Sequence, residues 1–197
     1  MILGITGGTG CGKTTLLQLI RQRGGLVLDC DEIYHQLLIS DWALLEALRQ
    51  RFPQAFPGGS FDRKKLGSIV FADAQALSDL NAITHSAVRQ EVERRLEEAP
   101  PLAAIDAIGL FESGLNRLCD LTVAVTAPEE ARVQRLMQRD SISPEYARSR
   151  IAAQPSAQWF AERCDAVLEN NGTAEEFRKK SIAFLDSHGI IKTVCSG

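Results

Sequence analysis

The chain has 197 residues, of which 45% are hydrophobic and 24% are charged. This length suffices for one main hydrophobic core with a small inserted lobe, whereas two independent domains would each be short of apolar residues. Twenty-two lysines and arginines against 25 aspartates and glutamates give a formal net charge of −3, without a basic tail or stripe. This balance argues against nucleic-acid binding and favours a small-molecule partner.

The cysteines and the N-terminal residues indicate the cellular compartment. Five cysteines, at positions 11, 30, 119, 164 and 195, form no CxxC pair and no cluster with histidine at metal-ligand spacing, so we interpret them as reduced thiols. The chain starts directly on a strand pattern without a leader, and no apolar run approaches the roughly 18 residues of a membrane span. We therefore expect a cytoplasmic protein without a membrane partner.

The first half of the chain reads as two strands and a helical lobe. Residues 2–6 are apolar, rich in β-branched side chains and followed by glycines, which predicts a buried strand and a turn. A helical pattern covers 14–23, and a second short strand at 26–28 ends at Asp29-Cys30-Asp31. From 32 to 98 the pattern is helical, with proline and glycine interruptions and no strand signal, which indicates an inserted lobe.

In the second half, strand and helix patterns alternate. Strands are expected at 102–105, 121–125 and 166–168, and a closing helix at 174–187. Two helices are expected to start at Thr126-Ala127-Pro128-Glu129 and Ser143-Pro144-Glu145, where a capping residue precedes proline and an acid. The alternation predicts an α/β fold with a mostly parallel sheet covered on both faces.

The strongest motif is Gly7-Gly8-Thr9-Gly10-Cys11-Gly12-Lys13-Thr14, a full match to G-x-x-x-x-G-K-[ST] between a predicted strand and a predicted helix. Glycines let the backbone N–H groups and the helix N-terminus face phosphates, Lys13 adds a positive charge, and Thr14 can hold Mg²⁺ through its hydroxyl. A simple glycine turn needs neither lysine nor threonine. The motif therefore predicts binding of ATP and Mg²⁺ by a P-loop NTPase fold.

Cys11 has two interpretations. A thiol adds nothing evident to phosphate binding, so Cys11 is first interpreted as a tolerated small residue. The alternative hypothesis is that the helix N-terminus lowers the pKa of the thiol and makes it alkylatable.

Asp29 and Asp31 are candidates for an acid–base role. If the extended conformation continues beyond the strand, both side chains point to the same side, toward the sheet edge where open α/β folds bind ligands. One of them could accept the proton of a substrate hydroxyl. The alternative is that one caps the helix expected from Glu32 onward.

Five arginines occur within nineteen residues, at positions 132, 135, 139, 148 and 150, on the two helices expected after the fourth strand. Guanidinium groups suit ATP phosphates, and two helices joined by a polar turn suit a closing lid. The alternative is a solvated face that pairs with Glu129, Glu130 and Glu145.

Several segments, in this order and spacing, resemble the dephospho-coenzyme A kinase family nearly end to end. They are GITGGTGCGKTT at 4–15, VLDCDEI at 27–33, FDRKKLGSIVF at 61–71, LFESG at 110–114, RLMQRD at 135–140, ARSRIAAQ at 147–154 and ENNGT at 169–173. The resemblance implies that ATP phosphorylates the ribose 3′-hydroxyl of 3′-dephospho-CoA, the last step of CoA synthesis, with Mg²⁺ as cofactor.

The resemblance also implies the organisation of the chain. It predicts a single P-loop kinase domain with a three-layer α/β/α core and a mostly parallel five-stranded sheet. The core is expected at 1–31, 100–127 and 164–197, a helical acceptor lobe at about 32–99, and a helical lid at about 128–163.

By the same resemblance, Asp31 is the general base, and Lys13 and Arg139 stabilise the migrating phosphoryl group. The ATP-binding residues that it implies are Gly8, Gly10, Cys11, Gly12, Lys13, Thr14, Thr15, Arg135, Arg139, Asn170 and Gly172. The acceptor-binding residues that it implies are Asp31, Arg63, Leu66, His85, Leu110 and Glu112.

The chain departs from the family pattern at three places. The family usually has D-x-P-L-L-[FV]-E where this chain has DAIGLFE at 106–112, so Ile108 and Gly109 replace a proline and a leucine. Ser86 stands where the family favours proline. Pro155 follows Gln154 and is expected to shorten or bend the second lid helix.

Two other functions are compatible with the phosphate loop. One is a P-loop kinase for a different nucleoside, nucleotide or small acceptor such as shikimate. The other is a nucleotide-dependent switch, against which the missing N-K-x-D motif and the arginine-rich lid argue. The sequence is compatible with a monomer or a small homo-oligomer.

Overall fold

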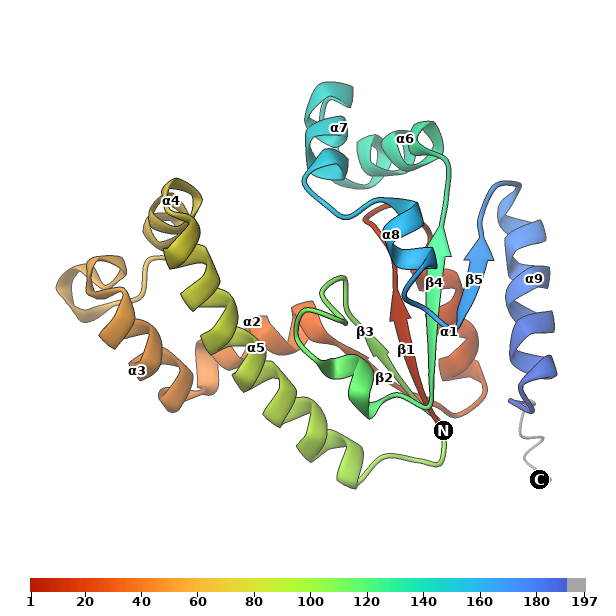
Figure 1. Ribbon diagram of the computed structural model, residues 1–197, viewed down its shortest axis with the longest axis horizontal. Coiled ribbons are helices and arrows are strands. Elements are labelled where there is room, and N and C mark those ends of the chain that lie inside the picture. The colour runs from red at the N-terminus through yellow and green to blue at the C-terminus, as the bar shows by residue number, and fades with distance from the viewer. Residues whose placement is uncertain (191–197) are drawn as a thin grey trace. The chain divides into compact units, whose positions relative to one another are not determined.

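A five-stranded sheet with the order β2-β3-β1-β4-β5 forms the centre of the core (Figure 1). The computed structural model describes residues 1–190. The central strand β1 pairs in parallel with β3 on one side and β4 on the other, and β4 pairs in parallel with β5. The strands are β1 (Ile2–Thr6), β2 (Leu26–Asp29), β3 (Ala103–Asp106), β4 (Leu121–Thr126) and β5 (Ala166–Glu169).

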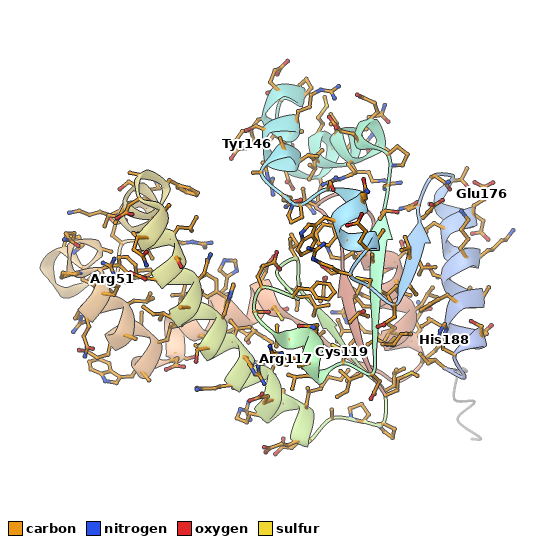
Figure 2. The ribbon with its side chains drawn as sticks, in the orientation of Figure 1. Arg51, Arg117, Cys119, Tyr146, Glu176 and His188 are labelled. Atoms are coloured by element: carbon orange, nitrogen blue, oxygen red, sulfur yellow. The ribbon has the colours of Figure 1, made fainter. Side chains whose placement is uncertain are left out.

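Helices cover both faces of this sheet, as the sequence predicts. On one face α1 (Lys13–Gln22) and α9 (Ala174–Ser187) pack against each other and bury the inward side chains of β1 and β4. On the other face α8 (Ala157–Ala161) lies on β4, in front of the sheet in Figure 1. The α9 helix starts with a capping box between Thr173 and Glu176, and Figure 2 shows Glu176 at this end.

Two further helices, α6 (Glu129–Asp140) and α7 (Pro144–Ala152), follow β4 and share a small apolar core. Side chains of Ser143 and Ser156 accept hydrogen bonds from the first turns of α7 and α8. The predicted break at Pro155 is confirmed, because α7 ends at Ala152 and a separate helix starts at Ala157.

The chain separates into two compact units. One contains Met1–Leu28 and the described residues from Glu98 onward, and the other is Asp29–Glu97. The second unit consists of α2 (Cys30–Ser40), α3 (Trp42–Arg51), α4 (Arg63–Ala72) and α5 (Ala74–Glu97), with short 3₁₀ turns at Pro53–Ala55 and Pro57–Gly59. In this unit α5 packs against α2, α3 and α4, and Leu48 and Val92 are fully buried.

The five strands lie within one or two residues of their predicted positions, but one helix boundary differs. The α2 helix begins at Cys30, not at Glu32, because Asp29 acts as its N-cap. The four cysteines among the described residues are not joined by disulfide bonds, and Cys195 lies outside the described part. Within residues 1–190, no helix has the length and apolar character that crossing a bilayer requires.

Candidate active site

The phosphate loop, residues 7–14, connects the carboxyl end of β1 to the first turn of α1. Gly7, Gly10 and Gly12 have φ values of 131°, 77° and 97°, which side chains rarely allow. A Cβ atom on Gly7 would collide with the Val125 carbonyl of β4. Gly12 is the N-cap of α1 and provides no side-chain acceptor, so the first N–H groups of the helix remain available to an anion.

Lys13 and Asp106 meet beside this loop. Lys13 Nζ donates to the Gly7 carbonyl at 2.9 Å and lies 3.9 Å from Asp106 Oδ1. Asp106 ends β3, whose register places it opposite Ile5 of β1, two residues before the loop. An ammonium and a carboxylate therefore lie beside each other at the phosphate-binding edge of the sheet, and Thr14 is exposed one residue after Lys13.

The second half of the loop is bound by Arg135 and Asn170. Arg135 Nη1 donates to the carbonyl oxygens of Gly10 at 3.0 Å and Cys11 at 3.3 Å. Asn170 follows β5, is only 5% exposed, and its Nδ2 donates to the Cys11 carbonyl at 2.9 Å. Two side chains from distant parts of the sequence thus hold the second half of the loop by its carbonyl groups.

Cys11 is part of the hydrophobic core. It is 3% exposed and belongs to the apolar cluster beneath β1, α1 and α9. Its side chain therefore packs against apolar residues, while its carbonyl oxygen accepts hydrogen bonds from Arg135 and Asn170. This burial accounts for a small apolar side chain at this position and makes the alkylatable-thiol hypothesis wrong for this conformation.

The remaining arginines of α6 and α7 form ion pairs with neighbouring carboxylates. Arg139 Nε and Nη2 contact the Asp140 carboxylate at 2.7 and 2.9 Å, and Arg150 Nη1 contacts the same carboxylate at 2.6 Å. These hydrogen bonds lower the pKa of Asp140 to about 2. Arg148 pairs with Glu129 and Glu130. The cluster thus divides, with Arg132 and Arg135 on the loop and the other three in surface ion pairs.

Asp29 and Asp31 have different environments. Asp29 Oδ1 accepts from the N–H groups of Asp31 at 3.0 Å and Glu32 at 3.1 Å, and so caps α2. Asp31 is exposed in the first turn of that helix. The expectation that both carboxylates follow one extended strand is therefore wrong, because the helix starts between them. Of these two carboxylates, only that of Asp31 is not used as a helix cap.

The other predicted acceptor residues differ in accessibility. Arg63 is exposed at the start of α4, His85 is half-buried in α5, and Glu112 is exposed after β3. Leu66 is 3% exposed and Leu110 is fully buried. The two leucine side chains therefore pack inside the protein, so a substrate contact there would have to come from their backbone.

A pocket of about 220 Å³ opens at the carboxyl ends of β4 and β5. It is lined by Thr126, Ala127, Pro128, Ala157, Glu169 and Asn171. The loop after β5 thus borders this pocket on one side and, through Asn170, the phosphate loop on the other.

Known proteins share this architecture along almost the whole chain. The sequence model of the dephospho-CoA kinase family matches residues 1–176. The chain belongs to this family. It is 38% identical to the dephospho-CoA kinase of Symbiobacterium thermophilum (90% of this chain, 77% of the relative) and 36% identical to that of Geobacter sulfurreducens (91% and 94%). The crystal structure of TT1252 from Thermus thermophilus aligns with a TM-score of 0.81 at 35% identity, covering 95% of this chain and 97% of that one.

Within this chain of the dephospho-CoA kinase family, the segment after β3 contains Ile108 and Gly109, where the resemblance described above leads us to expect proline and leucine. The Ile108 carbonyl accepts a hydrogen bond from Thr6 Oγ1 at 3.2 Å, so this turn is fixed to the end of β1. A Cβ atom on Gly109 would approach only Glu112, at 3.9 Å. The backbone therefore does not require glycine at position 109, and there is space for the Cβ atom of a leucine.

Three residues of the site are not singled out individually by the sequence. Asp106 appeared only as the first letter of the DAIGLFE segment, although a carboxylate that ends a strand adjacent to the phosphate loop is a recognisable signal. Arg132 was one member of an arginine cluster, and Gln154 ended a family motif. The contacts of Arg132 and Gln154 with Thr9 depend on the tertiary structure.

Proposed function

We propose that the protein transfers the γ-phosphoryl group of ATP to the ribose 3′-hydroxyl of 3′-dephospho-CoA and releases CoA and ADP. The observation that carries this proposal is a complete phosphate loop, with Lys13 beside Asp106, in a chain of the dephospho-CoA kinase family. We place the reaction in the cytoplasm, where ATP is available as co-substrate and where free thiols, such as those of the four cysteines among the described residues, are usual.

The loop supports nucleotide binding by its backbone and by Lys13. Backbone N–H groups and the start of α1 bind the phosphate oxygens, and Lys13 neutralises the charge on the transferred group. The oxygen donors of Thr14 and Asp106 fit Mg²⁺, which takes one or two protein ligands in addition to phosphates and water. Bound there, Mg²⁺ would neutralise negative charge on the phosphates.

The helical unit supplies the acceptor side of the proposal. Asp31 is the base that orients the ribose hydroxyl and takes its proton, since the neighbouring Asp29 is used in capping. Arg63 and His85 are proposed to bind the acceptor. Burial raises the pKa of Tyr34, and the positive charge of Arg63 offsets part of this rise. An arginine and a phenol in the same unit suit a phosphorylated, aromatic acceptor.

The helices after β4 are proposed as the lid that closes over ATP. They carry Arg135, which already contacts the loop, and Arg139, which is proposed to leave Asp140 for the migrating phosphoryl group. Asn170 and Gly172 are proposed to border the adenine base, because the loop that contains them also lines the pocket at the ends of β4 and β5.

The test is direct detection of the product. Purified protein is incubated with Mg-ATP and 3′-dephospho-CoA, and mass spectrometry is used to look for a product heavier by one phosphoryl group, with Lys13→Met as the inactive control. Shikimate, nucleosides and nucleoside monophosphates are assayed in parallel. Phosphorylation of one of these acceptors, without conversion of dephospho-CoA, would contradict the proposal.

A further inference from the structure

The peptide groups of Thr9, in the first half of the phosphate loop, are bound on both sides. Arg132 Nε donates to the Thr9 carbonyl at 2.9 Å, and Gln154 Oε1 accepts from the Thr9 N–H at 2.8 Å. Arg132 Nη2 also donates to Gln154 Oε1, at 3.3 Å. Arg132 lies on α6 and Gln154 just after α7, so two lid elements converge on one loop residue.

Arg132 is unusual because it is a buried cation. It is 6% exposed, and among residues 1–190 no carboxylate forms a salt bridge with it. The acceptors of its hydrogen bonds, the Thr9 carbonyl and the Gln154 amide, are both neutral. A buried guanidinium without a counter-charge destabilises a protein, and an anion bound nearby compensates for it. A nucleotide bound to the adjacent phosphate loop would supply such an anion.

Two loop glycines allow this approach. A Cβ atom on Gly8 would collide with Arg132 Nη2 and lie 3.2 Å from Gln154 Oε1. A Cβ atom on Gly10, whose φ is 77°, would lie 3.0 Å from the Arg132 carbonyl oxygen. The arginine backbone and guanidinium therefore lie against the loop on either side of Thr9; a side chain at position 8 would displace the guanidinium, and one at position 10 would be strained by the positive φ.

We propose that Arg132 and Gln154 form a latch, meaning that they are positioning residues which hold the Thr9 peptide groups in the phosphate-binding conformation. Arg132 in addition adds a buried positive charge next to the polyphosphate of ATP. The proposal rests on the nucleotide-binding function proposed above and goes beyond it, since it assigns to both residues an effect on ATP affinity through Thr9.

The latch makes a prediction that a stabilising role does not. Arg132→Met removes a buried charge that lacks a counter-ion, so the melting temperature of the free protein should stay the same or rise. At the same time the Kd and KM for ATP should rise about tenfold or more, the usual result of losing a charged hydrogen bond in a buried site. The KM for the acceptor should remain within about twofold. A merely structural role predicts a lower melting temperature and unchanged ATP affinity.

The experiment measures ATP affinity by isothermal titration and both KM values for Arg132→Met, Arg132→Lys and Gln154→Leu. Arg132→Lys keeps the charge and should recover part of the affinity. Both side chains act on the same Thr9 peptide groups. The loss of ATP affinity in the double variant Arg132→Met/Gln154→Leu should therefore be clearly smaller than the sum of the losses in the two single variants. Arg163→Gln and Gln158→Leu, both on the surface of the same unit, are the matched controls.

The outcomes separate the latch from the function on which it rests. Wild-type protein that binds no ATP would defeat both. Wild-type protein that binds ATP, with folded Arg132→Met and Gln154→Leu variants that bind it equally well, would overturn the latch alone. Additive effects in the double variant, or equal losses in the control variants, would also overturn it.

Discussion

The Lys13 ammonium lies 3.9 Å from the Asp106 carboxylate, and the two side chains are only 14% and 15% exposed. The electrostatic attraction in this pair is stronger than in a surface ion pair, because low exposure reduces screening by water and salt. It also places a carboxylate where a P-loop protein needs a group for magnesium.

We predict that Asp106→Asn raises the Mg²⁺ concentration required for half-maximal activity by about 10- to 100-fold, the usual loss when a group supporting a metal is removed. ATP affinity without Mg²⁺, measured by titration, should not fall, since the positive charge of Lys13 is then less neutralised. Asp120→Asn, at the opposite end of the sheet, is the control. An unaltered Mg²⁺ dependence in Asp106→Asn would exclude this role.

A second prediction concerns the general base. Asp31→Asn should reduce kcat by about 10² or more, in the range for loss of a general base, while the Kd for ATP is unchanged. Asp29→Asn is a matched control, because asparagine caps helices as well as aspartate does and the hydrogen bonds to the start of α2 can persist. Full turnover of Asp31→Asn would remove Asp31 from this role.

A third prediction tests the packing beneath β1. A Cβ atom on Gly4 would lie 2.7 Å from Cys119 Sγ and 2.9 Å from Leu110 Cδ2. Gly4→Ala should therefore lower the free energy of unfolding by ~1–3 kcal/mol, as overpacking of a core does. Chemical denaturation monitored by circular dichroism would measure this change.

Cys119, which lies against Gly4, provides the control. Cys119 lies at the amino-terminal end of the sheet (Figure 2), and burial raises the pKa of its thiol to about 12. Removing its sulfur in Gly4→Ala/Cys119→Ala should restore part of the lost stability, because the space that the new methyl group needs becomes available. A double variant as unstable as the sum of both single variants would contradict the proposed clash.

Much of the fold was predictable because its signals are local. The strands are short apolar runs, the loop glycines precede Lys13, and the serines that cap α7 and α8 directly precede them. The break before α8 follows from Pro155 alone. Such patterns depend on neighbouring residues, so they do not require knowledge of the tertiary structure.

The contacts within the site were less predictable because they join distant residues. Asp106 reaches Lys13 only because β3 lies next to β1, and Gln154 reaches Thr9 across 145 positions of sequence. The choice between Asp29 and Asp31 depended on the two capping hydrogen bonds to Asp29, which decide where α2 starts. Sequence patterns predicted an arginine cluster near the ATP phosphates, but not that Arg132 and Arg135 are the two of its members that touch the loop.

The last prediction concerns the stability of the helical unit in acid. Glu91 accepts hydrogen bonds from Arg94 Nε at 2.8 Å and Arg95 Nε at 2.7 Å, and these contacts lower its pKa from 4.5 to about 2. A lowered carboxyl pKa in the folded state stabilises the protein above the unfolded value, and this contribution is lost as the pH falls through the folded value. Stability should therefore decline between about pH 4.5 and about pH 2.

Glu91→Gln should make the melting temperature less dependent on pH in this window, and should lower it above pH 5, where the wild-type ion pairs are complete. Arg94→Gln removes the main cause of the shift, so it should flatten the same part of the profile. Arg178→Gln, an exposed arginine on α9, is the matched control and should leave the acid profile steep. Differential scanning calorimetry from pH 2.5 to 7 provides the measurement, and equal acid slopes for wild type and Glu91→Gln would show that this carboxylate does not control the transition.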